Sequence, residues 1–424
     1  MNDVFCPLPW THLATKANGD LRLCCNSHQG PNNGLLRNES GEVYNLNRNR
    51  ISESRNADLA KDVRRAMLNN EKHTECRRCW DEEKFNIRSR RLQTLEYVDN
   101  YEEAVKITAA DGSIPDDHPY SDFDLRFGNL CNLKCRMCGP FDSSMWYEDH
   151  FLMTGAKFDD SGFKWYDRKE VWEDLESQIP TAEYVYIIGG EPTLIQSHFD
   201  FLQKCIDKDH AKDIKLEYST NLTNIQQKYL DIWSHFKGVH IGCSLDGVGA
   251  VNEYIRYPSK WKAIEKNLAR LNNHMADNLS LVLSITVCAY NIYYLDDIYK
   301  WNALNHNLAI SPHPLYRPKE LNPKILPRSA KEAIAKKLRA SYPWFEENIP
   351  RQDPKMFRYD KSAEKIIKDI EGYIEFMMSE DLSQELPSFW KLTNQLDEIR
   401  KEDIESSLPE LYDLIKDTEF KSFY

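Results

Sequence analysis

The stretch FDLRFGNLCNLKCRMCG, residues 123–139, places three closely spaced cysteines directly after an apolar run. The run from Phe123 to Phe127 is predicted to be a β-strand. Cys131, Cys135 and Cys138 follow it, so their thiols are predicted to lie in a loop at the carboxyl end of that strand. Active sites on parallel sheets gather at such ends. This loop is therefore the first candidate functional site.

Outward from this stretch, strand-like and helix-like runs alternate between residues 121 and 318. The other predicted strands are Tyr184–Ile188, Ile214–Tyr218, Val239–Leu245, Leu281–Val287 and Leu308–Ser311. The predicted helices between them are Lys169–Ile179, His198–Asp209, Ile225–Phe236, Trp261–Asn273 and Leu295–Asn305. Such alternation predicts βαβ units and a parallel sheet. Because these crossovers are right-handed, six successive units would curl into a partial barrel.

Three thiolates within eight residues can bind one face of a cubane iron–sulfur cluster, which ordinarily takes four cysteine ligands. Without an obvious fourth ligand nearby, one iron would stay open to a ligand from outside the protein. The alternative is a tetrahedral zinc site, which would need a fourth cysteine or histidine. His150 is the nearest candidate, and it lies in a helical-looking run. The motif favours the iron–sulfur cluster.

The Cys-x3-Cys-x2-Cys spacing resembles the cluster motif of the radical S-adenosylmethionine (SAM) superfamily. The resemblance implies a 4Fe–4S cluster on Cys131, Cys135 and Cys138 whose open iron binds SAM. One electron then cleaves SAM to give methionine and a 5′-deoxyadenosyl radical, which abstracts hydrogen from a substrate. The hard chemistry belongs to these cofactors, and the protein directs it. Met137 stands where the family often has an aromatic residue, and an apolar contact with adenine is expected there.

Further matches to the family follow at later strand ends. Gly189, Gly190, Glu191 and Pro192 resemble the motif that receives the SAM amino group, although a simple capped turn would read the same way. Ser219 and Asn221 resemble ribose contacts, with an ordinary helix N-cap as the alternative. Ser244, Asp246 and Arg256 resemble the peptide-maturase branch, where serine and arginine approach the SAM carboxylate. The expected SAM-binding residues are thus Met137, Gly189, Gly190, Glu191, Pro192, Ser219, Asn221, Ser244, Asp246 and Arg256.

A second group of cysteines lies before residue 80. Asn18-Gly19 predicts a two-residue hairpin turn that folds Cys24 back toward Cys6. Since residues alternate faces along a strand, we expect Cys25 to pack inside and Cys24 to be a ligand. Cys76 and Cys79 follow as a Cys-x2-Cys pair. The remaining cysteines, Cys205, Cys243 and Cys288, are expected to be small buried hydrophobic side chains.

This pattern resembles the twitch module, the shorter relative of the SPASM domain, which holds an auxiliary 4Fe–4S cluster in some radical SAM enzymes. The resemblance implies Cys6, Cys24, Cys76 and Cys79 as ligands. Such modules more often follow the barrel, whereas this one precedes it. A structural zinc site with four cysteine ligands is the alternative.

The resemblance predicts an α/β fold: a partial (β/α)6 radical SAM barrel with a small N-terminal cysteine-rich α+β module and a helical C-terminal extension. The expected divisions are residues 1–95 for the module, 96–120 for a linker, 121–318 for the barrel and 319–424 for the helical region. The chain has 424 residues and a net charge of −12. This acidic balance disfavours general nucleic-acid binding, and no apolar run is long enough to cross a membrane. With no visible signal peptide, a cytoplasmic location is expected.

The expected function is hydrogen abstraction from a peptide or protein side chain, giving an oxidation or a cross-link. Two alternatives stay open: oxidation of a sugar-derived small-molecule alcohol, and a non-catalytic iron–sulfur electron carrier. A zinc-stabilised binding protein is a further alternative. An electron donor such as flavodoxin or ferredoxin is expected as a partner. The sequence identifies no catalytic base and no specific substrate.

Overall fold

The computed structural model describes residues 3–27, 30–84, 89–96, 98, 100–274, 278–349 and 360–418. The chain divides into two compact units, each built from several segments. The first unit comprises Met1–Leu130, Asp159–Tyr218 and Gln226–Val239. The second comprises Cys131–Phe158, Ser219–Ile225 and His240–Tyr424. Residues 121–318, the predicted barrel region, therefore contribute to both units.

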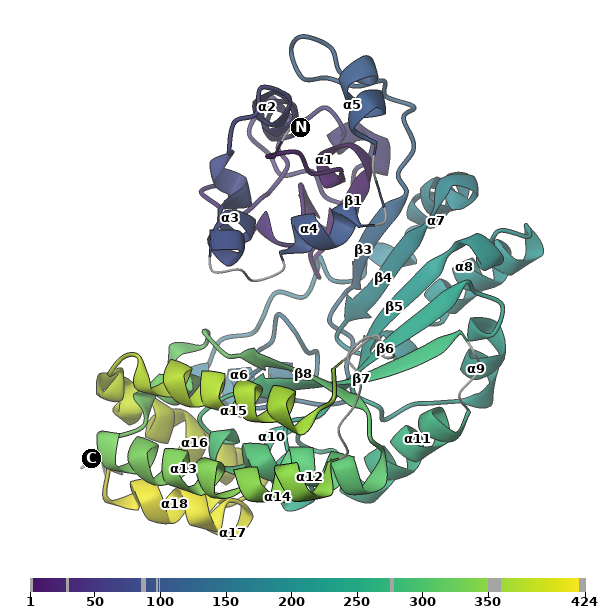
Figure 1. The fold of residues 1–424 in the computed structure, drawn as a ribbon. Helices are drawn as coiled ribbons and strands as arrows, with labels where there is room; N and C mark the ends of the chain where they lie inside the picture. Colours follow the sequence, from purple (N-terminus) through teal and green to yellow (C-terminus); the bar gives the residue numbers. More distant parts are fainter. Residues whose placement is uncertain are drawn as a thin grey trace. The chain divides into compact units, whose positions relative to one another are not determined.

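The first unit is organised around neighbouring strands of a mainly parallel sheet (Figure 1). Its strands are β1 (His12–Thr15), β2 (Leu21–Arg22), β3 (Asp122–Phe127), β4 (Tyr184–Gly189) and the start of β5 (Lys215–Thr220). β3 pairs in parallel with β4, and β4 pairs in parallel with β5. All residues of β3 except Arg126 are buried, as expected for a parallel strand that is covered on both faces.

Strand β1 extends this sheet beyond β3. The two strands are parallel, with His12 opposite Asp122. Side chains reinforce the pairing, because Asp122 Oδ1 lies 2.6 Å from His12 Nδ1 and Asp122 Oδ2 lies 3.1 Å from Arg90 Nη2. The cysteine-rich N-terminal segment is thus attached along the edge of the sheet. Nothing in the sequence pattern predicts this pairing.

The hairpin predicted at Asn18-Gly19 is present, but its turn is longer than two residues. β1 and β2 are antiparallel. The amide of Lys16 donates to the Asp20 carbonyl at 2.8 Å, and the amide of Gly19 donates to the Lys16 carbonyl at 2.9 Å. Gly19 has a φ of +82°, the left-handed conformation that follows a type I turn in a three-residue hairpin loop. The prediction of a two-residue turn is therefore wrong by one residue.

Short helices surround these strands in the first unit. They are α1 (Leu8–Thr11), α2 (Asp58–Leu68), α3 (Arg77–Lys84), α4 (Arg90–Leu95), α5 (Tyr101–Ile107), α7 (Lys169–Ser177), α8 (Gln196–Asp207) and α9 (Gln227–Trp233). In α2, the buried residues Ala60, Val63 and Met67 recur every three or four positions, which gives the helix one apolar face. α5 lies inside the segment that the sequence suggests is a linker.

The second unit contains the later strands and their helices. Strand β6 (Gly238–Ser244) enters it from the first unit, and β7 (Leu279–Val287) pairs in parallel with β8 (Ala309–Pro314). Its helices up to β8 are α6 (Trp146–Thr154), α10 (Ala250–Ile255), α11 (Trp261–Asn273) and α12 (Leu295–Asn305). The central cysteine loop, residues 131–138, belongs to this unit.

The C-terminal region of the second unit is helical (Figure 1). Its helices are α13 (Arg328–Ala340), α14 (Tyr342–Asn348), α15 (Ala363–Met378), α16 (Leu386–Arg400), α17 (Ile404–Ser407) and α18 (Pro409–Ile415). α15 buries Ile366, Ile370, Ile374 and Met377 at helical spacing. These side chains join one hydrophobic core with residues of α10, β7 and α12, so the region is part of the second unit and not an appendage.

The mixed α/β fold with a parallel-strand sheet and a helical C-terminal part is confirmed. The six strands predicted for the barrel region correspond to β3–β8, with ends that differ by at most three residues. Each of the five predicted helices corresponds to α7, α8, α9, α11 or α12. Across the ranges that the structure describes, no helix combines the length and apolar character needed to cross a bilayer.

Candidate active site

The central cysteine loop runs between β3 and α6, and its backbone is held by the segment that follows α10. The amide of Lys134 donates to the Tyr257 carbonyl at 2.7 Å, and the amide of Arg136 donates to the Ile255 carbonyl at 2.8 Å. Within the loop, the amide of Cys138 donates to the Cys135 carbonyl at 3.0 Å. These bonds fix the backbone of Lys134 and Arg136, on either side of Cys135, and that of Cys138.

Polar and cationic groups surround the three thiols. Cys131 Sγ lies 3.8 Å from the side-chain amide of Asn221, and Cys135 Sγ lies 4.0 Å from Arg256 Nη1. A hydrogen bond from Cys138, assisted by the Arg256 cation, lowers the pKa of the Cys135 thiol although burial opposes this shift. A lowered thiol pKa favours the thiolate, which is the form that binds metals.

The donor set fits an iron–sulfur cluster better than it fits a closed zinc site. Three thiols come from one short loop, with a cation beside them to balance their charge. In the described part of the chain, no group of three or more His, Cys, Asp or Glu side chains is already gathered as a metal site. The thiols of Cys135 and Cys138 already share a hydrogen bond. Cys131, Cys135 and Cys138 are the residues that would hold the cluster.

The glycine turn after β4 packs tightly against the segment that leads to the cysteine loop. A Cβ on Gly190 would lie 2.4 Å from the Leu130 carbonyl oxygen, and one on Gly189 would lie 2.8 Å from the Phe127 carbonyl oxygen. The amide of Glu191 donates to the Leu130 carbonyl at 2.8 Å. Only glycine fits these two positions without a shift of the backbone.

Glu191 itself is buried and caps the short helix that begins at Pro192. Its Oε1 accepts hydrogen bonds from the Thr193 amide at 3.1 Å and from the Thr193 hydroxyl at 2.7 Å. The capped turn weighed in the sequence analysis is thus present. That Glu191 also receives the SAM amino group stays a prediction.

Ser219 differs from the expected position, whereas Asn221 directly follows the strand as expected. β5 continues to Thr220, so Ser219 lies within the strand and not after it. Asn221 is buried and contacts the cysteine loop, because its Nδ2 donates to Asn132 Oδ1 at 3.0 Å. Its Oδ1 accepts from the Thr223 amide at 3.0 Å. Asn221 therefore ties the end of β5 to the loop.

Asp246 and Arg256 form a buried ion pair beside the loop. Arg256 Nε lies 2.6 Å from Asp246 Oδ2, and Asp246 Oδ1 accepts from the Thr286 amide at 2.8 Å. Both oxygens of Asp246 are thus engaged by protein groups, and Asp246 acts to position Arg256. Ser244 is the last residue of β6 and is half-buried. Met137 is half-buried too, with its side chain packed against the core of the second unit.

The four N-terminal cysteines come together in the first unit. Cys6, Cys24, Cys76 and Cys79 all line one cavity, together with apolar side chains and with Arg91. Burial, assisted by the neighbouring Cys79, raises the pKa of Cys76 to about 12. The thiols are near one another but are not drawn together as a formed metal site among the described residues. Their number and convergence fit a four-cysteine cluster or zinc site.

The structure separates Cys24 from Cys25. Cys24 lines the cavity, whereas Cys25 interacts with the buried imidazole of His12. The two sulfur atoms are 4.0 Å apart. This arrangement agrees with the expectation that Cys24 is the ligand, which stays a prediction.

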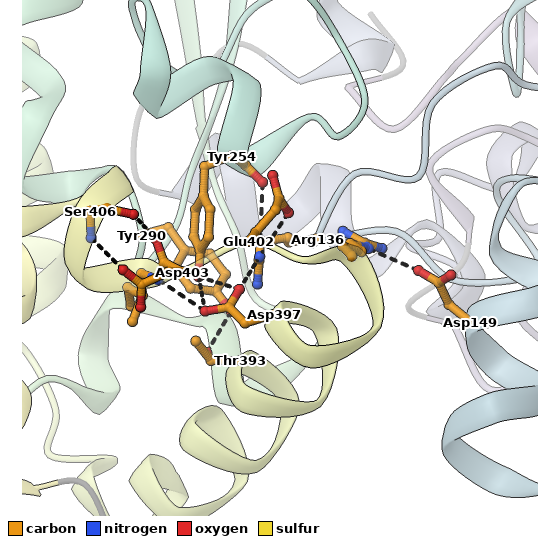
Figure 2. Close-up of polar contacts among 11 residues, drawn as sticks. Arg136, Asp149, Tyr254, Tyr290, Thr393, Asp397, Glu402, Asp403 and Ser406 are labelled. Atoms are coloured by element: carbon orange, nitrogen blue, oxygen red, sulfur yellow. Dashed lines mark hydrogen bonds and ion pairs between the residues drawn. The ribbon is translucent and has the colours of Figure 1, made fainter.

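Charged side chains from α6 and from the C-terminal region also hold the central loop (Figure 2). The sequence does not identify these partners. Arg136 pairs with Asp397 and with Glu402, and Lys134 pairs with Asp149. The only signal in the sequence is the presence of cations between the cysteines. Their partners Asp397 and Glu402 lie more than 250 residues downstream, where nothing in a single sequence links them to the loop.

Comparison with known proteins gives one family match. Residues 125–301 match the family described as the Radical SAM superfamily. This range contains the central loop, the glycine turn and Arg256. No curated protein matches the chain.

Several solved structures show a limited likeness. The structure of anSMEcpe with bound AdoMet and Kp18Cys peptide is 18% identical and covers 52% of this chain and 58% of that chain, with a TM-score of 0.35. Streptococcus suis SuiB bound to its precursor peptide SuiA is 16% identical and covers 71% and 62%, with a TM-score of 0.31. The methyltransferase TsrM from Kitasatospora setae, with cobalamin and a [4Fe-4S] cluster bound, is 12% identical and covers 43% and 33%, with a TM-score of 0.30. The match spans less than two thirds of each of these neighbours, and at such scores it carries no functional conclusion.

Proposed function

From the radical SAM domain at residues 125–301, we propose that this chain is an enzyme that cleaves SAM reductively and abstracts hydrogen from a peptide or protein side chain. The observation that carries the proposal is the central loop. Its three cysteines lie in one unit, and Arg256 Nη1 lies 4.0 Å from Cys135 Sγ. A loop that offers three thiolates beside a cation suits a cluster with one open iron and an anionic group of SAM bound next to it.

Each residue of the site has a distinct role in this proposal. Cys131, Cys135 and Cys138 hold the 4Fe–4S cluster. When bound, the cluster and SAM supply the chemistry, in which one electron cleaves SAM to methionine and a radical that removes a hydrogen atom. Arg256, oriented by Asp246, receives the SAM carboxylate, since a guanidinium pairs with a carboxylate through two hydrogen bonds.

We further propose that the N-terminal cavity holds a second 4Fe–4S cluster. Its four cysteines supply a complete ligand set, so this cluster would have no iron open to SAM. The cavity walls are mostly apolar, which suits an electron-transfer or structural centre. An electron removed from the substrate radical could enter this cluster, which would make the net reaction an oxidation or a cross-link.

Assignment to the class is tested by anaerobic reconstitution with iron and sulfide. The loaded protein, given SAM and dithionite, should form methionine and 5′-deoxyadenosine in equal amounts. Cys135→Ala should abolish the product while the protein stays folded. A protein that takes up iron and sulfide but forms no 5′-deoxyadenosine would be an electron carrier. A protein that retains zinc and no sulfide would be a zinc-stabilised binding protein.

The substrate class requires a separate test. The loaded enzyme is incubated with SAM and a library of peptides, and each peptide is analysed by mass spectrometry. Loss of two mass units, with deuterium transfer from labelled peptide to 5′-deoxyadenosine, would identify a peptide oxidation or cross-link. Turnover of sugar-derived alcohols with no change in any peptide would replace the peptide proposal by the small-molecule alternative.

A further inference from the structure

The cations of the central loop are buried, which requires that they be paired. The side chain of Arg136 has no exposed surface and that of Lys134 is 10% exposed. Removing a charge from water costs several kcal/mol unless an opposite charge and good hydrogen bonds replace the water. The groups that replace it decide how firmly the loop is held.

The partners of Arg136 come from the end of α16 and from α10. Its guanidinium pairs with Asp397, lies 3.0 Å from Glu402 Oε2 and stacks 3.5 Å from the centre of the Tyr254 ring. The hydroxyl of Tyr254 donates to Asp397 at 3.0 Å, and the amide of Ile404 donates to the same carboxylate at 2.9 Å. Asp397 therefore joins the cysteine loop, α10 and the start of α17 (Figure 2).

A second connection runs through Asp149 on α6. Its two oxygens bind Lys134 Nζ at 2.5 Å and Arg400 Nε at 2.8 Å. The side chains of Asp149 and Arg400 are both fully buried. Trp146 completes the connection, because its indole N–H donates to the Cys135 carbonyl at 2.9 Å and its ring lies 4.9 Å from the Arg400 guanidinium.

These contacts form a balanced set. Three cations, Lys134, Arg136 and Arg400, face three carboxylates, those of Asp149, Asp397 and Glu402. Loss of one carboxylate leaves excess positive charge buried in this set, and loss of one cation leaves excess negative charge there. A surface salt bridge would contribute little, whereas this set is buried and therefore constrains the loop strongly.

We propose that the end of α16 is a positioning clamp for the cluster-binding loop, with Asp397 as its central positioning residue. The clamp fixes the loop against the segment that carries Arg256. Arg136 donates from its amide to the Ile255 carbonyl and from Nε to the Tyr254 carbonyl at 3.0 Å. Arg256 follows directly. The clamp thereby sets the distance between the cysteines and the group proposed to receive SAM, and this consequence rests on the proposed function.

The clamp itself is tested in the full-length protein without iron, by hydrogen–deuterium exchange read by mass spectrometry. Asp397→Asn should speed exchange in the peptide that contains the Lys134 and Arg136 amides by about tenfold, because it leaves the buried Arg136 cation with Glu402 as its remaining carboxylate partner among the described residues. Glu398→Gln is the matched control: it removes a carboxylate from the adjacent, exposed position of α16 and should change nothing. Tyr254→Phe removes only the hydroxyl and should give a smaller increase in the same peptide.

The effect on SAM is tested after reconstitution with iron and sulfide. Asp397→Asn should keep its iron content but bind SAM about tenfold more weakly, the scale of a displaced charged contact. The change that SAM causes in the EPR spectrum of the reduced cluster should be diminished. Asp397→Glu, which keeps the charge, should restore most of both properties, and Glu398→Gln should match the wild type.

Two outcomes would overturn the clamp. One is unchanged exchange at residues 134–136 in both Asp397→Asn and Tyr254→Phe. The other is faster exchange spread evenly over the second unit, which would make Asp397 a general stabilising residue. Failure of the proposed function looks different, because the wild type would then build no cluster or bind no SAM while the metal-free exchange result stood.

Discussion

The two cysteine sites of this protein are built in opposite ways. The central loop takes three thiols from eight consecutive residues and sets a cation, Arg256, beside them. The N-terminal cavity gathers four thiols from segments spread over residues 6–79 and surrounds them mainly with apolar side chains. Burial raises the pKa of Cys6 and Cys76, whereas in the central loop one hydrogen bond between Cys135 and Cys138 lowers the pKa of Cys135 and raises that of Cys138.

The difference shows two ways of bringing cysteines together: by closeness in the sequence or by folding of the chain. The central ligands are close before folding, so the fold has only to fix the loop. The four N-terminal cysteines meet only when the module folds, so the metal binding proposed there is coupled to folding. The central loop offers three thiols and so leaves a position for an outer ligand, while the four thiols of the N-terminal cavity suit a closed metal centre.

The largest effect is expected when the cysteines of one site are removed and those of the other are kept. The combined substitution Cys131→Ala, Cys135→Ala and Cys138→Ala should lower the iron content of reconstituted protein by about half, since each cubane holds four irons. It should also abolish 5′-deoxyadenosine formation. Iron and acid-labile sulfide assays measure the first effect and chromatography the second. Retention of the full iron content would show that the loop holds no cluster.

A second test distinguishes the adjacent cysteines of the N-terminal site. Cys24→Ser should lose the second cluster and, with it, the amide protection that the metal gives the module, because structural metal sites contribute directly to folding. Cys25→Ser should retain the iron, since Cys25 contacts His12 and does not line the cavity. Iron analysis of the two variants side by side measures the difference. Equal loss in both would remove the distinction between them.

A smaller effect is expected at the glycine turn. Gly190→Ala places a Cβ 2.4 Å from the Leu130 carbonyl, so the turn must shift by a fraction of an ångström. SAM should bind about tenfold more weakly, as expected when a close contact of the turn is displaced, while iron content stays unchanged. Gly372→Ala, in α15, is the control, because a Cβ there meets no atom within 4 Å and its φ is not positive. Isothermal titration calorimetry with SAM measures the affinity of both variants.

The smallest expected effect concerns the attachment of β1. Burial disfavours the charged imidazole of His12, but the Asp122 carboxylate at 2.6 Å raises its pKa to about 10. Because the folded-state pKa lies above the unfolded value of about 6.5, the stabilisation is complete below pH 6.5 and is lost as the pH rises through 10. Amide exchange in β1, corrected for its intrinsic pH dependence, should therefore accelerate over this range. His12→Gln should show no such acceleration.

The sequence predicts those parts of the fold that depend on local pattern. The apolar runs of β3 to β7 and the amphipathic helices between them are recognisable from the spacing of their apolar residues. Cys205, Cys243 and Cys288 are buried as expected. The Asn18-Gly19 dipeptide predicts the position of the hairpin correctly but a turn that is one residue too short. The dipeptide does not distinguish two-residue from three-residue loops.

The sequence does not predict the long-range pairings, because they leave no local pattern. The parallel contact of β1 with β3 joins residues 12 and 122, and Asp397 meets Arg136 across 261 positions. No sequence feature near either residue indicates which residue is its partner. In the candidate site, spacing identified the cysteines and the glycine turn, but the groups that orient them are ordinary acidic and aromatic residues whose role depends on the folded chain.

The attachment of β1 along β3 has a practical consequence. A chain begun near residue 121 would display the backbone donors and acceptors of β3 to solvent along a buried, apolar strand, and such strands recruit other chains. Removing the cysteine-rich segment to obtain a simpler enzyme would then favour aggregation whether or not the second cluster matters for catalysis. The N-terminal segment therefore shields this edge of the sheet, independently of the cluster proposed for its cysteines.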